Sequence, residues 1–256
     1  MMGTDRNSEN FEYPRHPVQV PSFYLDATEV TNREYLKFLE ATRGNALASD
    51  AMIWPGSGRE IVEGTGSEGR KAVGEGMGRP DPAKLDWPVT NVTYAKATEY
   101  AAWRGCRLPT EDELEWAARG VAELVGPPNL PRDWRDHKDD WLSLHDVLKV
   151  PGDRSQVGNS VIRGLYANAS EITLFGFRFY PGFTSQREGV APDNHVVRCG
   201  LVTQAGTKEP MTLGYVRRGI IQRNAQHPLV GFRCARSLDR PGLTLRSTSV
   251  ESASNR

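Results

Sequence analysis

The residues best suited to redox or nucleophilic chemistry are three cysteines, Cys106, Cys199 and Cys234, which lie far apart in the sequence. No two of them form a Cys-x-x-Cys pair, and this excludes the ligand spacing of zinc ribbons and of thioredoxin-like sites. Cys199 follows His195 by four residues, which on a strand would place both side chains on one face. That spacing alone does not orient a thiolate for attack. We therefore expect each cysteine to be a buried free thiol.

Metal ligands of the oxygen and imidazole type gather between residues 133 and 146. They are Asp133, Asp136, His137, Asp139, Asp140, His145 and Asp146. No pair among them has a diagnostic spacing such as His-Glu-x-x-His. Apolar residues recur at helical spacing through the same segment, at Trp134, Trp141, Leu144 and Leu148. We therefore interpret the acidic residues as the solvated face of an amphipathic helix rather than as a metal site.

Other catalytic signatures are missing from the sequence. The five histidines form no pattern of a catalytic triad, and no P-loop sequence occurs. Gly74-Glu-Gly-Met-Gly is rich in glycine, but it lies in a loop-like stretch and follows no strand, so it lacks the context of a dinucleotide-binding turn. None of these residues indicates triad-type or nucleotide-dependent chemistry.

The composition limits the class of partner. The chain has 256 residues, of which 38% are hydrophobic, and its formal net charge is zero. A neutral chain has no overall field that would favour nucleic acid or an anionic membrane. The 25 glycines and 17 prolines predict a large share of loop. No apolar run is long enough to span a bilayer, and residues 1–20 are polar and charged, unlike a signal peptide.

The clearest structural signals are two helix starts that would position the rest of the chain. Thr110 and Glu113 have the spacing of a capping box, in which the hydroxyl and the carboxylate each accept from the other residue's backbone N–H. Thr31 and Glu34 repeat this pattern near the N-terminus. Gly120 is placed to end the second helix with a positive φ angle.

The same stretches carry a resemblance to a known family. Residues 107–119, Arg-Leu-Pro-Thr-Glu-Asp-Glu-Leu-Glu-Trp-Ala-Ala-Arg, are similar to the RLPTE-x-E-W-E-x-A-A-R signature of the formylglycine-generating enzyme (sulfatase-modifying factor) family. Residues 29–38 resemble the family's E-V-T-N-x-x-Y-x-x-F, and residues 231–235 match its closing G-F-R-x-A. The resemblance implies an α+β, C-type-lectin-like fold with short twisted antiparallel strands, a few helices and much irregular loop.

We expect one family-like domain over residues 14–237, after a flexible segment at 1–13 and before a disordered, Ser/Arg-rich tail at 238–256. Residues 43–86 are rich in glycine and are interpreted as an insertion, a mobile solvated loop rather than a binding lid. Met2-Gly3 resembles an interior Met-Gly of the family that normally follows a strand. If an upstream segment has been removed, we expect an extracytoplasmic location, periplasmic or secreted, and otherwise a cytoplasmic one.

The motifs described above do not include the cysteine pair that the family's oxidases use for catalysis. Those members bind copper(I) through two cysteines, four residues apart, shortly after an Arg-Gly-Gly-Ser strand. Residues 200–233 contain no cysteine, and Cys199 stands too early to match either thiol. The resemblance therefore implies a diverged member without copper and without formylglycine formation. It also implies that Cys106 and Cys234 would be the bonded pair if any disulfide forms, because they lie beside family motifs that pack together.

One metal site of the family could be retained. The family's Gly-Asn-Val-Trp-Glu turn holds a calcium ion through backbone carbonyls, the Asn side chain and the Glu carboxylate. Residues 164–173 resemble a diverged version of this turn, in which Asn168 and Glu171 keep the two side-chain ligands. The resemblance thus implies a calcium site at Asn168 and Glu171. The alternative is that Glu171 accepts hydrogen bonds from backbone N–H groups of its own turn, and both interpretations stay open.

The leading functional hypothesis is a non-catalytic binding or scaffolding module, a pseudoenzyme that presents residues 43–86 and 175–226 to a protein, peptide or glycan partner. Recognition usually resides in loops on a rigid scaffold, although a fold alone does not license a function. One alternative is a diverged metal-dependent oxidoreductase of the same superfamily. The other is a ligand-recognising domain of a larger signalling protein.

Residues 175–187 are the strongest candidate for the partner surface, because they contain four Phe, one Tyr and two Arg. Aromatic residues and arginine are enriched in interface cores and hot spots. Strand alternation would turn the phenylalanines at 175, 177 and 179 toward the core and leave Arg178 and Tyr180 on the opposite face. We therefore predict that Arg178, Tyr180 and Arg187 contact the partner.

Overall fold

The computed structural model describes residues 1–3, 12–43, 80–125, 144–149, 154–157, 160–165, 168–183, 193–198 and 218–238. Most of the Gly-rich stretch at 43–86, the tail beyond residue 238, Cys199 and Arg187 lie outside these ranges, as do the acidic residues at 133–140. Among the described residues, no helix combines the length and the apolar character needed to cross a bilayer.

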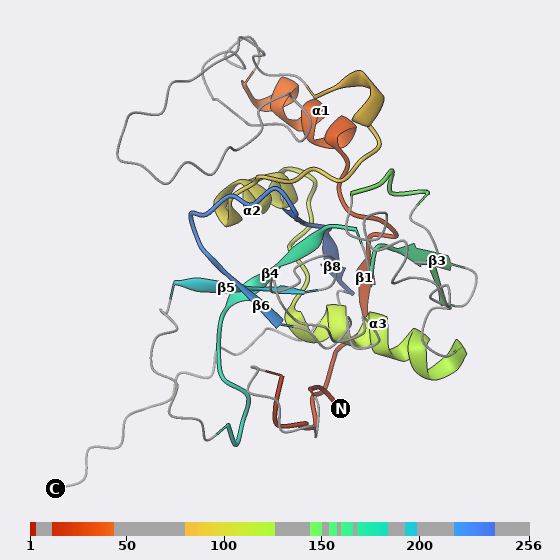
Figure 1. Cartoon of the computed structure of the whole chain (residues 1–256), viewed down its shortest axis with the longest axis vertical. Helices are drawn as coiled ribbons and strands as arrows, with labels where there is room; N and C mark the ends of the chain where they lie inside the picture. The colour runs from red at the N-terminus through yellow and green to blue at the C-terminus, as the bar shows by residue number, and fades with distance from the viewer. Residues whose placement is uncertain are drawn as a thin grey trace, which may run out of the picture.

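Three α-helices and eight short strands make up the described fold (Figure 1). The helices are α1 (Asn32–Arg43), α2 (Tyr94–Trp103) and α3 (Glu111–Val125), with a 3-10 turn at Pro82–Lys84. The strands are β1 (Phe23–Leu25), β2 (Arg154–Val157), β3 (Ser160–Arg163), β4 (Ser170–Gly176), β5 (Asn194–Arg198), β6 (Arg218–Gln222), β7 (Val230–Gly231) and β8 (Ala235–Ser237).

The strands form one small central sheet and two ribbons. The central sheet has the order β6-β5-β4-β7, and β4 pairs antiparallel with β5 and parallel with β7. The β1–β8 and β2–β3 ribbons are antiparallel. The expected α+β architecture is confirmed, with one parallel pair that the sequence did not indicate. In Figure 1, α1 and α2 lie above the central sheet and α3 lies below it.

Aromatic rings from distant segments fill the main core between α1, α2 and the sheet. The ring of Tyr100 lies 5.4 Å from that of Phe38 and 5.3 Å from that of Phe232, both in edge-to-face geometry. Tyr35 stacks on Tyr100 at 5.6 Å. Such pairs contribute roughly 0.5–1.5 kcal/mol beyond the burial of their area. A second core cluster lies at α3. It consists of Leu114, Ala117 and Ala118 of that helix together with Leu165.

Both predicted capping boxes are present and start their helices as expected. Glu113 Oε2 accepts from the N–H of Thr110 at 2.8 Å, and Thr110 Oγ1 accepts from the N–H of Glu113 at 3.1 Å. The equivalent distances for Thr31 and Glu34 are 2.9 and 3.2 Å. The Glu113 carboxylate also accepts from two nitrogens of Arg107 at 2.6 and 2.7 Å, so it joins the helix start to the link before it.

Two sequence-based boundaries were wrong. Helix α3 continues through Gly120 to Val125, because the cost of an internal glycine is only about 1 kcal/mol and the residues after it suit a helix. Residues 144–149 contain a turn rather than the predicted helix. Asp146 Oδ1 accepts from the N–H of Leu148 at 2.9 Å, and its carbonyl accepts from Lys149, so a local Asx turn replaces helical hydrogen bonds there.

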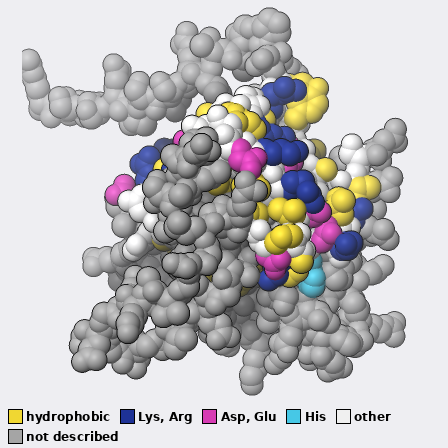
Figure 2. Space-filling view, turned by 90° about the horizontal axis from the view of Figure 1, so that it is seen from above, with side chains coloured by type: hydrophobic (Ala, Val, Ile, Leu, Met, Phe, Trp, Pro, Cys, Tyr) yellow, Lys and Arg dark blue, Asp and Glu magenta, His cyan; other side chains and the backbone are white. Residues whose placement is uncertain are grey.

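The surface agrees with the neutral composition. Figure 2, which looks down on the molecule from the side of α1, shows cationic, acidic and hydrophobic side chains interspersed among the described residues.

We predict that Thr110→Ala lowers the free energy of unfolding by about 1 kcal/mol, because it removes the acceptor for the Glu113 N–H. Chemical denaturation monitored by circular dichroism measures this change. Thr110→Ser keeps the hydroxyl and is the matched control, which should stay close to wild type. An unchanged midpoint for the alanine variant would contradict the role of this cap.

Candidate functional site

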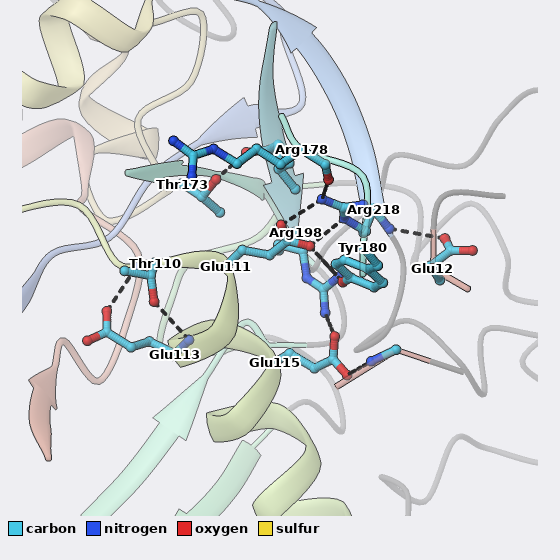
Figure 3. Close-up of polar contacts among 12 residues, drawn as sticks. Glu12, Thr110, Glu111, Glu113, Glu115, Thr173, Arg178, Tyr180, Arg198 and Arg218 are labelled. Atoms are coloured by element: carbon cyan, nitrogen blue, oxygen red, sulfur yellow. Dashed lines mark hydrogen bonds and ion pairs between the residues drawn. The ribbon is translucent and has the colours of Figure 1, made fainter. Parts of the chain in front are cut away.

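A buried ion network lies where α3 meets the central sheet (Figure 3). Arg198, the last residue of β5, is completely buried. Its guanidinium donates to the carboxylate of Glu111 at 3.2 Å and also to that of Glu115. Both glutamates come from the first two turns of α3, and the charge of Glu111, which lies in the first turn, also suits the helix dipole. A cation buried here is thus satisfied by two anions from one helix.

Arg218, the first residue of β6, extends the network toward the surface. Its Nη2 donates to Glu111 Oε2 at 2.9 Å and to the backbone carbonyl of Arg178 at 2.8 Å. Its guanidinium also lies 4.1 Å from the ring centre of Tyr180 and 4.8 Å from that of Phe177. The Arg218 side chain therefore contacts the segment after β4 at one backbone carbonyl and at two aromatic rings.

The N-terminus is tied to the same network. The N–H of Gly3 donates to Glu115 Oε1 at 2.8 Å, and Glu12 Oε1 accepts from the N–H of Arg218 at 3.1 Å. Met2 is buried and forms an antiparallel bridge with His16. Both described ends of the segment expected to be flexible, residues 1–13, thus have packed partners in the structure, while residues 4–11 lie outside the described ranges.

Tyr180 is buried, contrary to its predicted place on an exposed strand face. Its hydroxyl donates to Glu111 Oε1 at 2.9 Å, and burial raises the pKa of this phenol. The reason is that β4 ends at Gly176, so strand alternation does not continue to residue 180. A turn follows instead, in which the Tyr180 carbonyl accepts from Phe183 and Gly182 has a φ of 84°. Tyr180 therefore anchors the segment rather than presenting its ring to solvent.

Two of the phenylalanines, Phe175 and Phe179, are exposed, which is opposite to the predicted orientation, and Phe177 and Phe183 are partly buried. Phe175 is 60% exposed and Phe179 is 43% exposed, and Arg178 is exposed as predicted. Phe179 packs edge-on against Phe177 at 5.1 Å between ring centres and stacks on Phe183 at 4.8 Å. We call Phe175, Phe177, Arg178, Phe179 and Phe183 the aromatic surface. Arg187, the third predicted contact, lies outside the described residues.

The predicted calcium ligands both have other partners. Both oxygens of the fully buried Glu171 accept from Arg233, Oε2 from Nε at 2.8 Å and Oε1 from Nη2 at 2.7 Å. The same guanidinium donates to the carbonyls of Asp26 and Arg163. Asn168 has a left-handed φ of 68°, and its Oδ1 accepts from the N–H of His145 at 2.8 Å.

These contacts do not fit a calcium ion. A guanidinium that is bonded to both carboxylate oxygens repels a divalent cation and takes one lone pair of each oxygen. Within the described ranges, no group of three or more His, Cys, Asp or Glu side chains could hold a metal. The calcium site stays a prediction, and the geometry favours a structural role for Glu171. Its partner is an arginine of the closing Gly-Phe-Arg motif, which the sequence analysis did not connect with it.

The structure describes one member of the Cys199 and His195 pair, which the sequence analysis had not expected to act as a nucleophile and base. His195 is buried, stacks on Tyr94 at 3.7 Å between ring centres, and has its pKa lowered by burial. Cys199 lies outside the described residues. Cys234 is a buried free thiol, as predicted, whereas Cys106 is a free thiol that is only partly buried.

One family model and several known proteins are similar to this chain in sequence. Residues 1–149 match the family described as the sulfatase-modifying factor enzyme 1-like domain. The mouse protein named inactive C-alpha-formylglycine-generating enzyme 2 is 33% identical over 276 residues, which cover 94% of this chain and 84% of that protein. The serine/threonine-protein kinase pkn1 of Chlamydia caviae is 27% identical over 91% of this chain. The chain spans only 36% of the length of that kinase.

Two solved structures share the fold. The structure of PvdO from Pseudomonas aeruginosa has a TM-score of 0.53 at 20% identity and covers 93% of this chain and 90% of that protein. Treponema denticola variable protein 1 has a TM-score of 0.50 at 16% identity, with 93% and 91% coverage. At these identities the likeness shows the fold alone, and it confirms the fold that the sequence motifs implied.

We predict that Glu171→Gln lowers the free energy of unfolding by on the order of 3 kcal/mol, because it leaves the buried Arg233 without its counter-charge. The loss should be equal in calcium and in chelator when melting is followed in both buffers. Asp86→Asn, which breaks an exposed pair with Arg33, is the matched control and should have a much smaller effect. A loss that appears only in calcium would place the ion at this turn.

Proposed function

Because this chain belongs to the formylglycine-generating enzyme family, as its sulfatase-modifying factor enzyme 1-like domain shows, we propose that it is a non-catalytic binding or scaffolding module. Its partner would be a protein, a peptide or a glycan. The sequence supports the non-catalytic part, since cysteines occur only at positions 106, 199 and 234 and no thiol pair follows the β5 region. A mouse relative whose name describes it as inactive supports the same conclusion.

The observation that carries the proposal is the aromatic surface on a rigid base. Three of its members are linked ring to ring, and its backbone is held at the Arg178 carbonyl by Arg218. Arg218 is in turn held by Glu111 of α3. A surface that is ordered before binding loses less conformational entropy when a partner arrives. Exposed rings on such a base suit recognition better than rings on a loose loop.

The chemistry of the surface defines the kind of partner. Exposed rings such as Phe175 and Phe179 offer flat apolar faces, onto which a peptide side chain or a sugar ring can pack. Arg178, between them in sequence, can donate paired hydrogen bonds to a carboxylate or a carbonyl. An extended peptide with apolar and acidic residues, or a glycan with an acidic sugar, combines these two requirements.

A second candidate is a ligand-recognising domain of a larger signalling protein. The observation that favours it is the kinase relative, which matches almost the whole of this chain with only 36% of its own length. In this second function the ligand would bind to the same aromatic surface. The difference is that binding would then change the activity of another domain of the larger protein.

We predict that the aromatic surface selects peptides or glycans, and that the double variant Arg178→Ala/Phe179→Ala weakens their binding at least tenfold. A displayed library of random peptides and a glycan array provide the ligands, and calorimetry with the enriched ones provides the affinities. Tyr24→Ala, which removes an exposed ring from β1, is the matched control and should bind like wild type. Tyr180→Phe should also keep binding, because that hydroxyl is buried against Glu111.

Two results would contradict this prediction. Ligands that bind the double variant as tightly as wild type would place the binding site elsewhere on the molecule. A failure to enrich any ligand from either source would count against a binding module of this kind.

We also predict that the protein does not convert the cysteine of a sulfatase-type peptide to formylglycine, because the thiol pair that would bind copper(I) is missing. Mass spectrometry of the peptide after incubation with copper-loaded protein and oxygen checks this. A catalytically competent family member serves as the positive control. A mass loss in the peptide that requires this protein would support the alternative of a diverged metal-dependent oxidoreductase.

A further inference from the structure

His195 is a buried ionisable side chain that lies next to the aromatic surface. It is the second residue of β5, and it is only 6% exposed. In the ladder between β4 and β5 it lies opposite Gly176, the last residue of β4. The N–H of the next residue, Phe177, donates to the carbonyl of Asn194 at 2.6 Å. His195 is therefore placed where β4 ends and the segment that carries most of the aromatic surface begins.

The surroundings of this ring suit its neutral form. The ring packs face to face on Tyr94, the first residue of α2, with 3.7 Å between ring centres. The Tyr94 hydroxyl donates to the carbonyl of Leu174 at 2.9 Å, so the stacked pair joins α2 to β4 and β5. Nδ1 of His195 is buried and has no hydrogen-bond partner among the residues that the structure describes. A neutral imidazole can leave one nitrogen unprotonated, whereas an imidazolium carries a proton on both nitrogens and would bury an unsatisfied donor here.

The charges around the ring also disfavour protonation. Burial has the largest effect and lowers the pKa of His195, and the positive charge of Arg223 lowers it further. Arg223 directly follows β6, and its guanidinium lies 5.4 Å from the centre of the Tyr94 ring. Two backbone groups of β4 and the carboxylate of Asp193, just before β5, raise the pKa, and stacking on a tyrosine also favours a cation. The lowering effects are larger, so the folded protein prefers the neutral ring.

We propose that His195 is a pH-sensitive switch of the aromatic surface, in which protonation of its buried ring loosens the end of β4 and lowers the affinity for a partner. The change in affinity rests on the proposed binding function, whereas the loosening is a property of the chain alone. A protonated ring would have to move away from Tyr94 or admit water. Either movement would disturb the contact of Tyr94 with β4 and the bond between Phe177 and Asn194.

The direction of the pH dependence follows from the lowered pKa of His195. The unfolded chain takes up this proton near the ordinary histidine pKa of about 6.5, and the folded chain does so only at lower pH. Between these two pH values the unfolded state binds more protons, so stability falls as the pH falls. The contribution of the neutral ring is thus complete above about pH 6.5 and is lost progressively below it. The switch would operate under mildly acidic conditions.

The first test needs no ligand. Protection of the Phe177 amide against hydrogen exchange, corrected for the intrinsic rate at each pH, reports on its bond to Asn194. We expect this protection to fall several-fold in the wild-type protein between about pH 7.5 and about pH 5.5. His195→Phe should remove most of that pH dependence, because phenylalanine can stack on Tyr94 but cannot become charged. His195→Gln is a second uncharged variant, for the case that the phenylalanine does not fit.

His227→Phe is the matched control. Burial lowers the pKa of His227 as well, but this residue lies between β6 and β7, where its Nδ1 accepts from the N–H of Leu229. Its replacement should leave the pH dependence at Phe177 unchanged. The switch is overturned if the Phe177 amide of the wild-type protein is equally protected at both pH values. It is also overturned if both His195 variants keep the wild-type pH dependence.

The second test measures binding of the peptide or glycan that is enriched from the displayed library or the array. Calorimetry should show several-fold weaker binding by the wild-type protein at the acidic pH, and His195→Phe should lose this difference. Equal affinity at both pH values, with loss of Phe177 protection at the acidic one, would overturn the coupling of His195 to the aromatic surface. If no ligand is enriched, the proposed function fails, and hydrogen exchange alone decides whether His195 loosens β4.

Discussion

The buried charge of Arg198 is the constraint on which the rest of the site depends. A guanidinium that is removed from water must find its compensation inside the protein, because an unpaired buried charge costs several kcal/mol. Glu111 and Glu115 supply that compensation from one helix, and this fixes how α3 sits against β5. The position of α3 in turn fixes Tyr180 and Arg218, which share Glu111 with Arg198.

A second buried pair, next to Arg198 in the ladder between β4 and β5, joins β4 to the end of the described chain. Arg233 and Glu171 are both completely buried and are joined by two hydrogen bonds. Nearby, Gly164 has a φ of 71°, and a Cβ atom there would lie 2.3 Å from the Glu29 carboxylate. A side chain at residue 164 would therefore collide with Glu29, and the positive φ angle also favours glycine there. Removing one partner of such a pair leaves an uncompensated buried charge, so each residue depends on the other.

These contacts explain why the family motifs persist in a chain without the oxidase thiols. Glu111, Glu113, Glu115, Glu171 and Arg233 all lie within motif stretches, and each has a partner in the framework. The motif residues therefore pair buried charges and cap helices. The fold needs these contacts whether or not the molecule catalyses a reaction. Recognition usually resides in loops on such a framework, and the exposed Phe175 and Phe179 lie near the end of β4 and just after it.

The sequence by itself determined the family, the fold class and the starts of α1 and α3, because capping boxes join residues only three apart and depend on little else. It also determined that no copper-binding thiol pair is present. Only the tertiary structure decided that Glu171 pairs with Arg233, since any of the 32 basic side chains could have neutralised it. It also decided that Tyr180 is buried while Phe175 and Phe179 are exposed. Strand alternation predicts orientation only along a regular strand. The pairing of β4 with β5 shifts register between Ile172 and Gly176, around Phe175, and β4 ends at Gly176, before the turn that follows Tyr180.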